Sequence, residues 1–216
     1  MKSVAQTSNN RLVLTVQLLL TITVLTACSS TGSGDVTKDQ PHNRIDLSAT
    51  SANMVPVLTP ESVFRIDRYE VTSLQRKLYF SAPNQDPLTS VTLGEAREIC
   101  KSLGKNLCSE GQWLQACLGT SRLAYGYASR FFRERCNVSG KGLSPTGSHR
   151  ECLSDGQIYD MIGNAMEWVE SDVSPTSGIV AGGSYMSGNE ANCFTRQIVS
   201  TNSRSPQVGF RCCGNG

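Results

Sequence analysis

Histidine, excess charge of either sign and long apolar runs are scarce in this 216-residue sequence. Its only histidines are His42 and His149, and it has no Cys-x-x-Cys pair, so it lacks the ligand spacing typical of a zinc site. Lys and Arg number 20 against 18 Asp and Glu, which leaves no strong basic excess to indicate nucleic acid as a partner. No internal repeat is visible. These absences argue against zinc-binding, nucleic-acid-binding and repeat classes.

The longest apolar run, from Leu12 to Ala27, lies near the N-terminus and follows Lys2 and Arg11 with no acidic residue. Its 16 residues are interrupted by one glutamine and four threonines, whereas a spanning helix needs ~20 mostly apolar residues. The pattern predicts a signal peptide over residues 1–27. Leu25-Thr26-Ala27-Cys28 resembles a bacterial lipobox, so we expect cleavage before Cys28 and a lipid on its thiol. The alternative is a cysteine that follows an uncleaved run by chance.

The residues after Cys28 bear on where the lipid is anchored. An aspartate in the next position would resemble an inner-membrane retention signal; Ser29 stands there, so we expect the outer membrane. Residues 28–60 are rich in Ser, Thr, Gly, Asp and Asn and predict a lipidated flexible tether. About 32 such residues span on the order of 30 Å. Residues 61–216 are long enough for a single domain with its own core.

Eight further cysteines lie in the predicted domain. An even number in an exported chain indicates a disulfide framework. The residues by themselves leave the pairing open. The eight are Cys100, Cys108, Cys117, Cys136, Cys152, Cys193, Cys212 and Cys213.

Two helices and several short strands are expected in the domain. Thr92 to Glu95 and Ser109 to Gln112 each form a capping box that opens a helix. The first helix is expected to end at Gly104 and the second at Gly119. Alternation predicts a strand over Phe64–Val71, and short apolar pieces at 179–181 and 208–210 fit two more. Turn residues dominate after Gly119, so the expected class is α+β and loop-rich.

Several ordered motifs make the domain resemble the formylglycine-generating enzyme, or sulfatase-modifying factor, family. The resemblance covers about residue 60 to the end, and it implies that family's variant of the C-type-lectin-like fold, braced by disulfides. The matching segments are Tyr69–Thr72; Cys100 with Gly104 to Leu107, Glu110 and Trp113; Tyr159–Trp168; Gly182–Met186; and Gly209–Cys212.

The chemistry of that family resembles a copper-thiolate oxidation of a substrate cysteine. The resemblance places its two thiolates one and six residues after Met186, where this chain has Ser187 and Asn192. Ser184 matches a serine near the family's active site, but hydroxyl and amide groups bind soft Cu(I) poorly. Related iron enzymes of the fold use histidine clusters, and the domain has only His149. The resemblance therefore implies a domain without the catalytic cysteine pair.

Other roles also follow from the resemblance. It pairs Cys100 with Cys212 and Cys117 with Cys193, which leaves Cys136 to close a short loop with Cys152, and Cys108 to pair with Cys213. A vicinal disulfide between Cys212 and Cys213 is the alternative. The signature also resembles a structural calcium site, because hard oxygen ligands in a tight loop suit calcium; the alternative is a turn that needs no metal. The implied ligands are the side chains of Asp160 and Glu167 and the carbonyls of Gly163 and Ala165.

The hypothesis from sequence is a non-catalytic envelope lipoprotein whose domain binds or regulates another envelope protein. Its partners would be the membrane, through the lipid, and a protein, but not nucleic acid. The superfamily includes a protein resembling a periplasmic regulator of type VI secretion, and variable ligand-binding lipoproteins. In this chain the matching variable stretch is 187–207, which is polar; the alternative is plain solvated surface. The rival hypothesis is a divergent formylglycine-generating oxidase or non-heme iron enzyme acting outside the cytoplasm.

Overall fold

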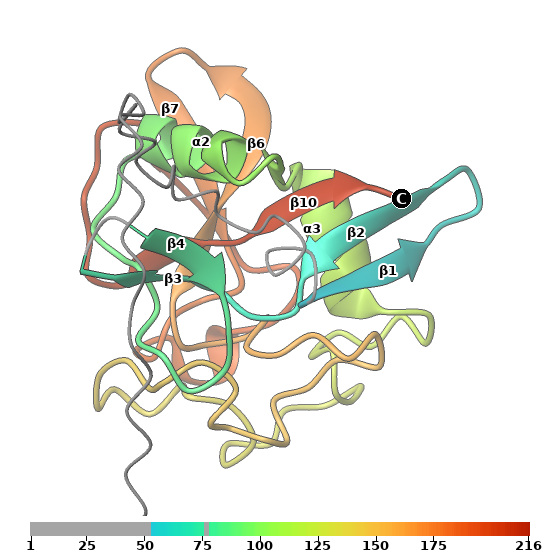
Figure 1. The fold of residues 1–216 in the computed structure, drawn as a ribbon. Coiled ribbons are helices and arrows are strands. Elements are labelled where there is room, and N and C mark those ends of the chain that lie inside the picture. Colours follow the sequence, from blue (N-terminus) through green and yellow to red (C-terminus); the bar gives the residue numbers. More distant parts are fainter. Residues whose placement is uncertain (1–52, 76–77) are drawn as a thin grey trace, which may run out of the picture. The chain divides into compact units, whose positions relative to one another are not determined.

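The computed structural model of the chain describes residues 53–75 and 78–216 (Figure 1). The signal peptide, Cys28 and most of the predicted tether lie outside the described residues and stay predictions. Within the described ranges no helix is both long and apolar enough to cross a bilayer.

The first sheet begins earlier in the chain than the sequence predicted. Strand β1 (Met54–Leu58) pairs antiparallel with β2 (Val63–Asp67), so the domain boundary expected at residue 61 is too late. Pro56 makes this strand hard to predict from the sequence, because proline within sheets is confined to edge strands. Strand β1 is indeed the edge of a sheet ordered β1-β2-β10-β5. The other two strands are β5 (Asn106–Leu107) and β10 (Cys212–Asn215).

The strand predicted over Phe64–Val71 is divided in two. Strand β2 ends at Asp67, the chain turns, and β3 (Val71–Leu74) forms a separate hairpin with β4 (Leu78–Ser81). The turn holds two buried carboxylates inward. Asp67 accepts hydrogen bonds from Lys105 and from the backbone N–H of Cys212, and Glu70 bonds Asn164. Local alternation carries no information about these distant partners.

Both predicted helices are present, with both capping boxes formed. Helix α2 (Leu93–Ser102) is capped by Thr92 and α3 (Glu110–Leu118) by Ser109. Gly104 and Gly119, just beyond the helix ends, have φ of 69° and 61°, a left-handed conformation that glycine adopts without strain.

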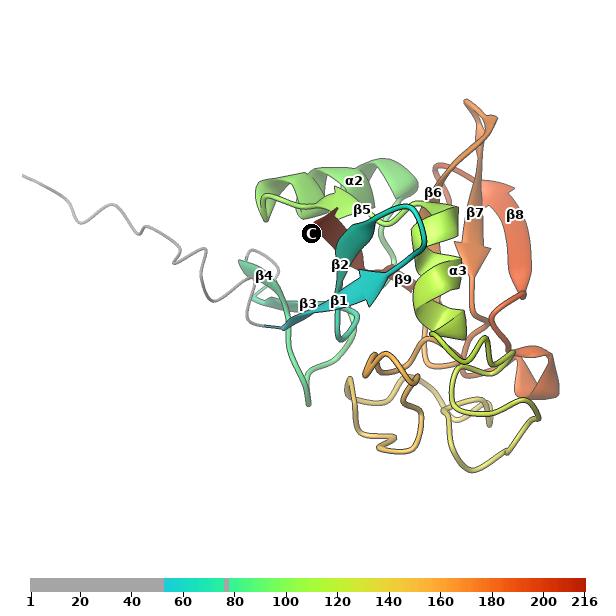
Figure 2. The same ribbon diagram turned by 90° about the vertical axis from the view of Figure 1, so that its right-hand side faces the viewer.

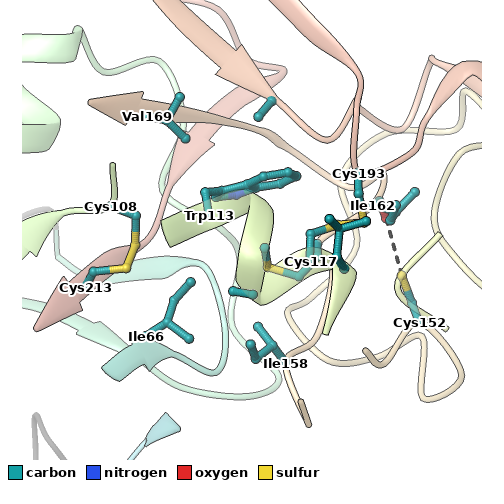
Figure 3. Close-up of a cluster of buried hydrophobic side chains, with 14 of the residues drawn as sticks. Ile66, Cys108, Trp113, Cys117, Cys152, Ile158, Ile162, Val169, Cys193 and Cys213 are labelled. Atoms are coloured by element: carbon teal, nitrogen blue, oxygen red, sulfur yellow. Dashed lines mark hydrogen bonds between the residues drawn. A yellow bond between two sulfur atoms is a disulfide. The ribbon is translucent and has the colours of Figure 1, made fainter. Parts of the chain in front are cut away.

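Both helices contact the second sheet, ordered β8-β7-β6-β9, at β6. Side chains alternate along β6, so Met166 and Trp168 pack in one core cluster with α2, whereas Val169 packs in the other with Trp113 of α3 (Figure 3). Burial on both faces makes this sheet the centre of the domain. Its strands are β6 (Met166–Ser174), β7 (Ser177–Ala181), β8 (Arg196–Ser200) and β9 (Val208–Phe210).

Long connections without helix or strand run from Gly119 to Ala165 and gather at one end of the domain in both views (Figures 1 and 2). A short 3-10 helix, η1 (Gly188–Glu190), follows β7. The class is therefore α+β and loop-rich, as the sequence predicted.

Candidate functional site

Four disulfides join the helices and loops to late segments of the chain. Cys100 of α2 bonds Cys212, and Cys117 of α3 bonds Cys193. The other two bridges are Cys108–Cys213 and Cys136–Cys152. The first two are the pairs that the family resemblance implies, and the other two are the pairs expected for the four cysteines that remain. The bridge between Cys117 and Cys193 lies beside Trp113 in the core (Figure 3).

A buried ion pair joins two of the sequence motifs. Strands β6 and β9 run parallel with Glu167 opposite Gly209, which brings Arg211 beside the Glu167 carboxylate. The Arg211 guanidinium donates to both carboxylate oxygens, at 2.6 to 3.0 Å, and Trp113 Nε1 donates to Glu167 Oε2 at 2.6 Å. Arg211 also donates to the backbone oxygens of Asp67 and Tyr159, at 3.0 Å each. One side chain thus ties three distant segments together.

Two more carboxyl groups lie close to this ion pair. Asn164 Nδ2 donates to both oxygens of Glu70 at 3.0 Å, and Asp160 Oδ2 accepts from the backbone N–H of Gly147 at 2.7 Å. Burial, together with the charges of Asp160 and Glu167, raises the pKa of Glu70 well above its usual value. Burial likewise raises the pKa of Asp160 to about 7. Acid groups outnumber cations here, and both pKa shifts favour the protonated carboxyl groups.

Two of the predicted calcium ligands, Asp160 and Glu167, belong to this network. Glu167 is surrounded by N–H donors and a guanidinium, which disfavour a cation at its oxygens, and Asp160 faces a backbone N–H. Across residues 53–75 and 78–216, no group of three or more His, Cys, Asp and Glu side chains is arranged to hold a metal. Calcium with the Gly163 and Ala165 carbonyls stays a prediction. Melting in calcium and in chelator tests it, since an ion bound only by the folded state raises Tm.

The loop Gly182–Met186 holds the serine that matches the family's active site. Ser184 Oγ donates to Gln207 Oε1 at 2.8 Å and accepts from the backbone N–H of Met186 at 3.2 Å. Ser187, at the first copper-ligand position, accepts from the backbone N–H of Ser184 at 2.9 Å. Gly183 packs against Ala191 and Ser187 with φ of 78°, so a side chain there would clash. The two serines are hydrogen-bonded parts of one tight loop.

Asn192, at the second copper-ligand position, does not join them. Its Nδ2 donates to the backbone oxygen of Glu190, and its Oδ1 accepts from the backbone N–H of Phe194, so both ends of the amide serve the local turn. The neighbouring sulfur, on Cys193, is in the disulfide with Cys117. These residues do not fit copper: the two positions carry a hydroxyl and an amide, and the nearest thiol is oxidised.

A groove with a volume of about 440 Å³ lies over the sheet at this loop. Its apolar floor comes from β6, β7 and β9, and Ser184 and Ser187 border it. The sequence flagged the polar stretch 187–207, and much of the groove wall comes from it. What sequence reasoning missed is the role of Gln207, the last residue of that stretch, which binds Ser184. The walls from this stretch are Ser187, Glu190, Gln197, Val199, Ser203, Ser205 and Gln207.

A larger hollow, of about 840 Å³, lies between the β3–β4 hairpin, the segment 86–91 and α2. No residue of the loop Gly182–Met186 and neither Glu167 nor Arg211 lines it. We place the candidate site at the smaller groove, because that is where the sequence-predicted residues Ser184 and Ser187 converge.

Comparison with known proteins gives a family and a fold. The chain matches the Sulfatase-modifying factor enzyme 1-like domain over residues 72–215. The protein named inactive C-alpha-formylglycine-generating enzyme 2 from Bos taurus is 27% identical over 149 residues, covering 58% of this chain and 49% of that protein. The Mus musculus protein of the same name is 28% identical over 149 residues, covering 58% and 48%. The chain therefore spans about half the length of these curated relatives.

Solved structures share the fold at low sequence identity. PvdO from Pseudomonas aeruginosa superimposes with a TM-score of 0.57 at 15% identity, covering 71% of this chain and 81% of that one. Treponema denticola variable protein 1 superimposes with a TM-score of 0.54 at 14% identity, covering 76% and 92%. The fold is therefore the formylglycine-generating-enzyme variant of the C-type-lectin-like fold, as the resemblance implied.

Proposed function

Because this chain belongs to the Sulfatase-modifying factor enzyme 1-like domain family, we propose that it is a non-catalytic member that binds another envelope protein. The proposal rests on the residues at the two copper-ligand positions, neither of which is a cysteine. The Ser187 side chain is hydrogen-bonded within its loop, and the Asn192 side chain within a turn. The curated relatives are themselves named inactive.

The groove beside Ser184 is the surface we assign to the partner. It offers hydroxyl, amide and carboxylate groups above an apolar floor, and Met186 at its border is 61% exposed. Apolar anchors surrounded by polar groups are what protein interfaces use for affinity and orientation. The partner therefore presents an apolar side chain to the floor and hydrogen-bonding groups to the rim.

We also propose that the domain is held at the outer membrane by a lipid on Cys28, through the part of the predicted tether that precedes β1. The support is the lipobox-like sequence Leu25–Cys28 alone. The test is Cys28→Ser, which leaves unprocessed precursor and abolishes palmitate labelling. Normal processing and membrane retention of this variant would contradict the anchor.

The absence of catalysis is tested by mass spectrometry. A sulfatase-motif cysteine peptide is incubated with the purified chain, copper and reductant, and the thiol mass is expected to stay unchanged. Turnover that is lost in Cys193→Ser would overturn the proposal and make the chain a one-cysteine oxidase, the rival hypothesis.

Partner binding is tested by site-specific photo-crosslinking in the envelope. A photoreactive side chain at Gln197, in the groove wall, should give one discrete protein adduct, whereas the same group at Glu98, an exposed residue of α2, should not. Filling the groove with Ser203→Trp should remove the adduct. Adducts that are equal at Gln197 and Glu98, or that survive Ser203→Trp, would place the partner elsewhere.

A further inference from the structure

The segment 119–151 carries a net positive charge, which the rest of the domain does not. It contains six Arg and Lys residues against two Glu residues. All but one of its basic side chains belong to exposed residues, and the segment lies in the long connections at one end of the domain (Figure 1). The basic residues are Arg122, Arg130, Arg133, Arg135, Lys141 and Arg150, and the acidic ones are Glu134 and Glu151.

Two of these arginines are held against one aromatic ring. The Arg130 guanidinium carbon lies 4.7 Å from the Phe132 ring centroid, and that of Arg135 lies 4.8 Å from the same centroid. The two guanidinium carbons are therefore at most 9.5 Å apart, the sum of these distances. That spacing is within the Debye length of about 10 Å at 0.1 M salt, so one anionic surface interacts with both charges.

Contacts with Tyr127 hold the Phe132 ring in place. Tyr127 packs against Phe132 with ring centroids 6.5 Å apart, and its hydroxyl contacts the Phe132 backbone N–H and carbonyl at 3.3 and 3.4 Å. Arg135 lies over Tyr127 as well and pairs with Glu151 at 3.3 Å. The disulfide Cys136–Cys152 closes the base of the loop. This cluster is a preorganised platform rather than scattered surface charge.

We propose that this platform, Arg130 and Arg135 over Phe132 with the exposed Arg133 between them in the sequence, contacts phosphate headgroups of the anionic membrane to which the chain is anchored. The inference rests on the lipid anchor proposed above. Guanidinium groups bind phosphate oxygens bidentately, and aromatic rings beside basic residues are favoured at membrane interfaces. Several exposed arginines on one loop match the repeated phosphates of a membrane surface. The predicted tether, which would span on the order of 30 Å, would keep the domain near that surface.

The test uses the full lipidated chain in vesicles. Ser129→Cys, next to Arg130, carries a fluorophore; the eight described cysteines are all in disulfides and do not react. A quencher on the lipid headgroups then reports how close the loop lies to the membrane. We expect stronger quenching in vesicles that contain phosphatidylglycerol than in phosphatidylcholine alone, and weaker quenching as salt is raised.

Variants make the assignment specific. Arg130→Ala should weaken the membrane-bound state about five-fold, the factor that corresponds to ~1 kcal/mol per basic residue near an anionic surface. Arg130→Lys should retain most of the membrane binding. Lys101→Ala, at an exposed site on α2, removes the same charge elsewhere and should leave quenching unchanged.

Three results would overturn the inference. Quenching could be equal in the two kinds of vesicle, or Lys101→Ala could reduce it as much as Arg130→Ala. Inorganic phosphate could also release the loop at an ionic strength at which chloride does not, which would assign the platform to soluble phosphate. Failure of the anchor looks different, because the chain then does not float with vesicles of phosphatidylcholine alone.

Discussion

The network around Arg211 and the groove beside Ser184 use polar side chains in opposite ways. In the network, Glu167 and Arg211 are both fully buried, and their charges hold β6, β9 and the end of β2 together. In the groove, hydroxyl and amide groups line a surface open to solvent. Part of the family signature therefore holds the fold, while Ser184 and Ser187, at positions to which the resemblance assigns chemistry, border a polar groove.

The comparison predicts its largest effect at the ion pair. Arg211→Met leaves the Glu167 carboxylate buried with only the Trp113 N–H as a strong donor, so unfolding free energy should fall by about 3–5 kcal/mol. Urea denaturation at neutral pH measures the loss. Adding Glu167→Gln to the same chain should recover part of it, since the uncompensated charge is then gone. If Arg211→Met lowers the unfolding free energy no more than a groove variant does, the contrast between the network and the groove is wrong.

The disulfides should contribute next. Cys100→Ser with Cys212→Ser opens a separation of 112 residues, whereas Cys136→Ser with Cys152→Ser opens one of 16. Removal of a native bridge should cost about 2–4 kcal/mol, with the longer loop costing more because it restricts the unfolded chain more strongly. Thermal unfolding of both double variants measures the difference. The reverse order would show that native packing, rather than chain entropy, sets the value.

A pH dependence should come mainly from the network. Asp160 has an ordinary pKa of 3.8 in the unfolded chain and about 7 in the folded one. Between these values the folded state holds a proton that the unfolded state has lost. Stability should therefore fall as pH rises from about 4 to 7, by at most ~1.4 kcal/mol per pH unit for this group.

Burial, with the charges of Asp160 and Glu167, raises the pKa of Glu70, so Glu70 adds to the fall in the same direction. Asp155 opposes it: burial raises its pKa, but hydrogen bonds from Ser121 and Thr120 outweigh that and lower it overall. Urea denaturation in chelator at several pH values measures the slope. Asp160→Asn should flatten it, and an unchanged slope in that variant would exclude Asp160 as the cause.

The smallest effect is expected in the groove. Ser184→Ala removes the hydrogen bond to Gln207 and should cost about 1 kcal/mol, while the photo-crosslink from Gln197 should weaken. Gln207→Ala serves as the matched variant from the other side of the same bond. If either variant unfolds the domain as Arg211→Met does, the groove is a structural element and the comparison fails.

The extent of prediction from sequence differed between local and distant features. The α+β class, both helix starts and both glycine stops were predicted correctly, because capping residues act within a few positions. The family match was also predicted from short motifs. The β1 strand was missed because Pro56 obscures it, and the Phe64–Val71 strand was predicted too long because its end depends on partners of Asp67 and Glu70 far along the chain.

The sequence, through its resemblance to the family, predicted that Ser187 and Asn192 stand at the copper-ligand positions, without the thiolate pair. It also determined where the helices begin and end. Only the tertiary structure decided that Glu167 meets Arg211, 44 residues away, and that Gln207 closes on Ser184. The physical reason is that capping is a local interaction between near neighbours, whereas burial and charge pairing depend on which strands lie side by side.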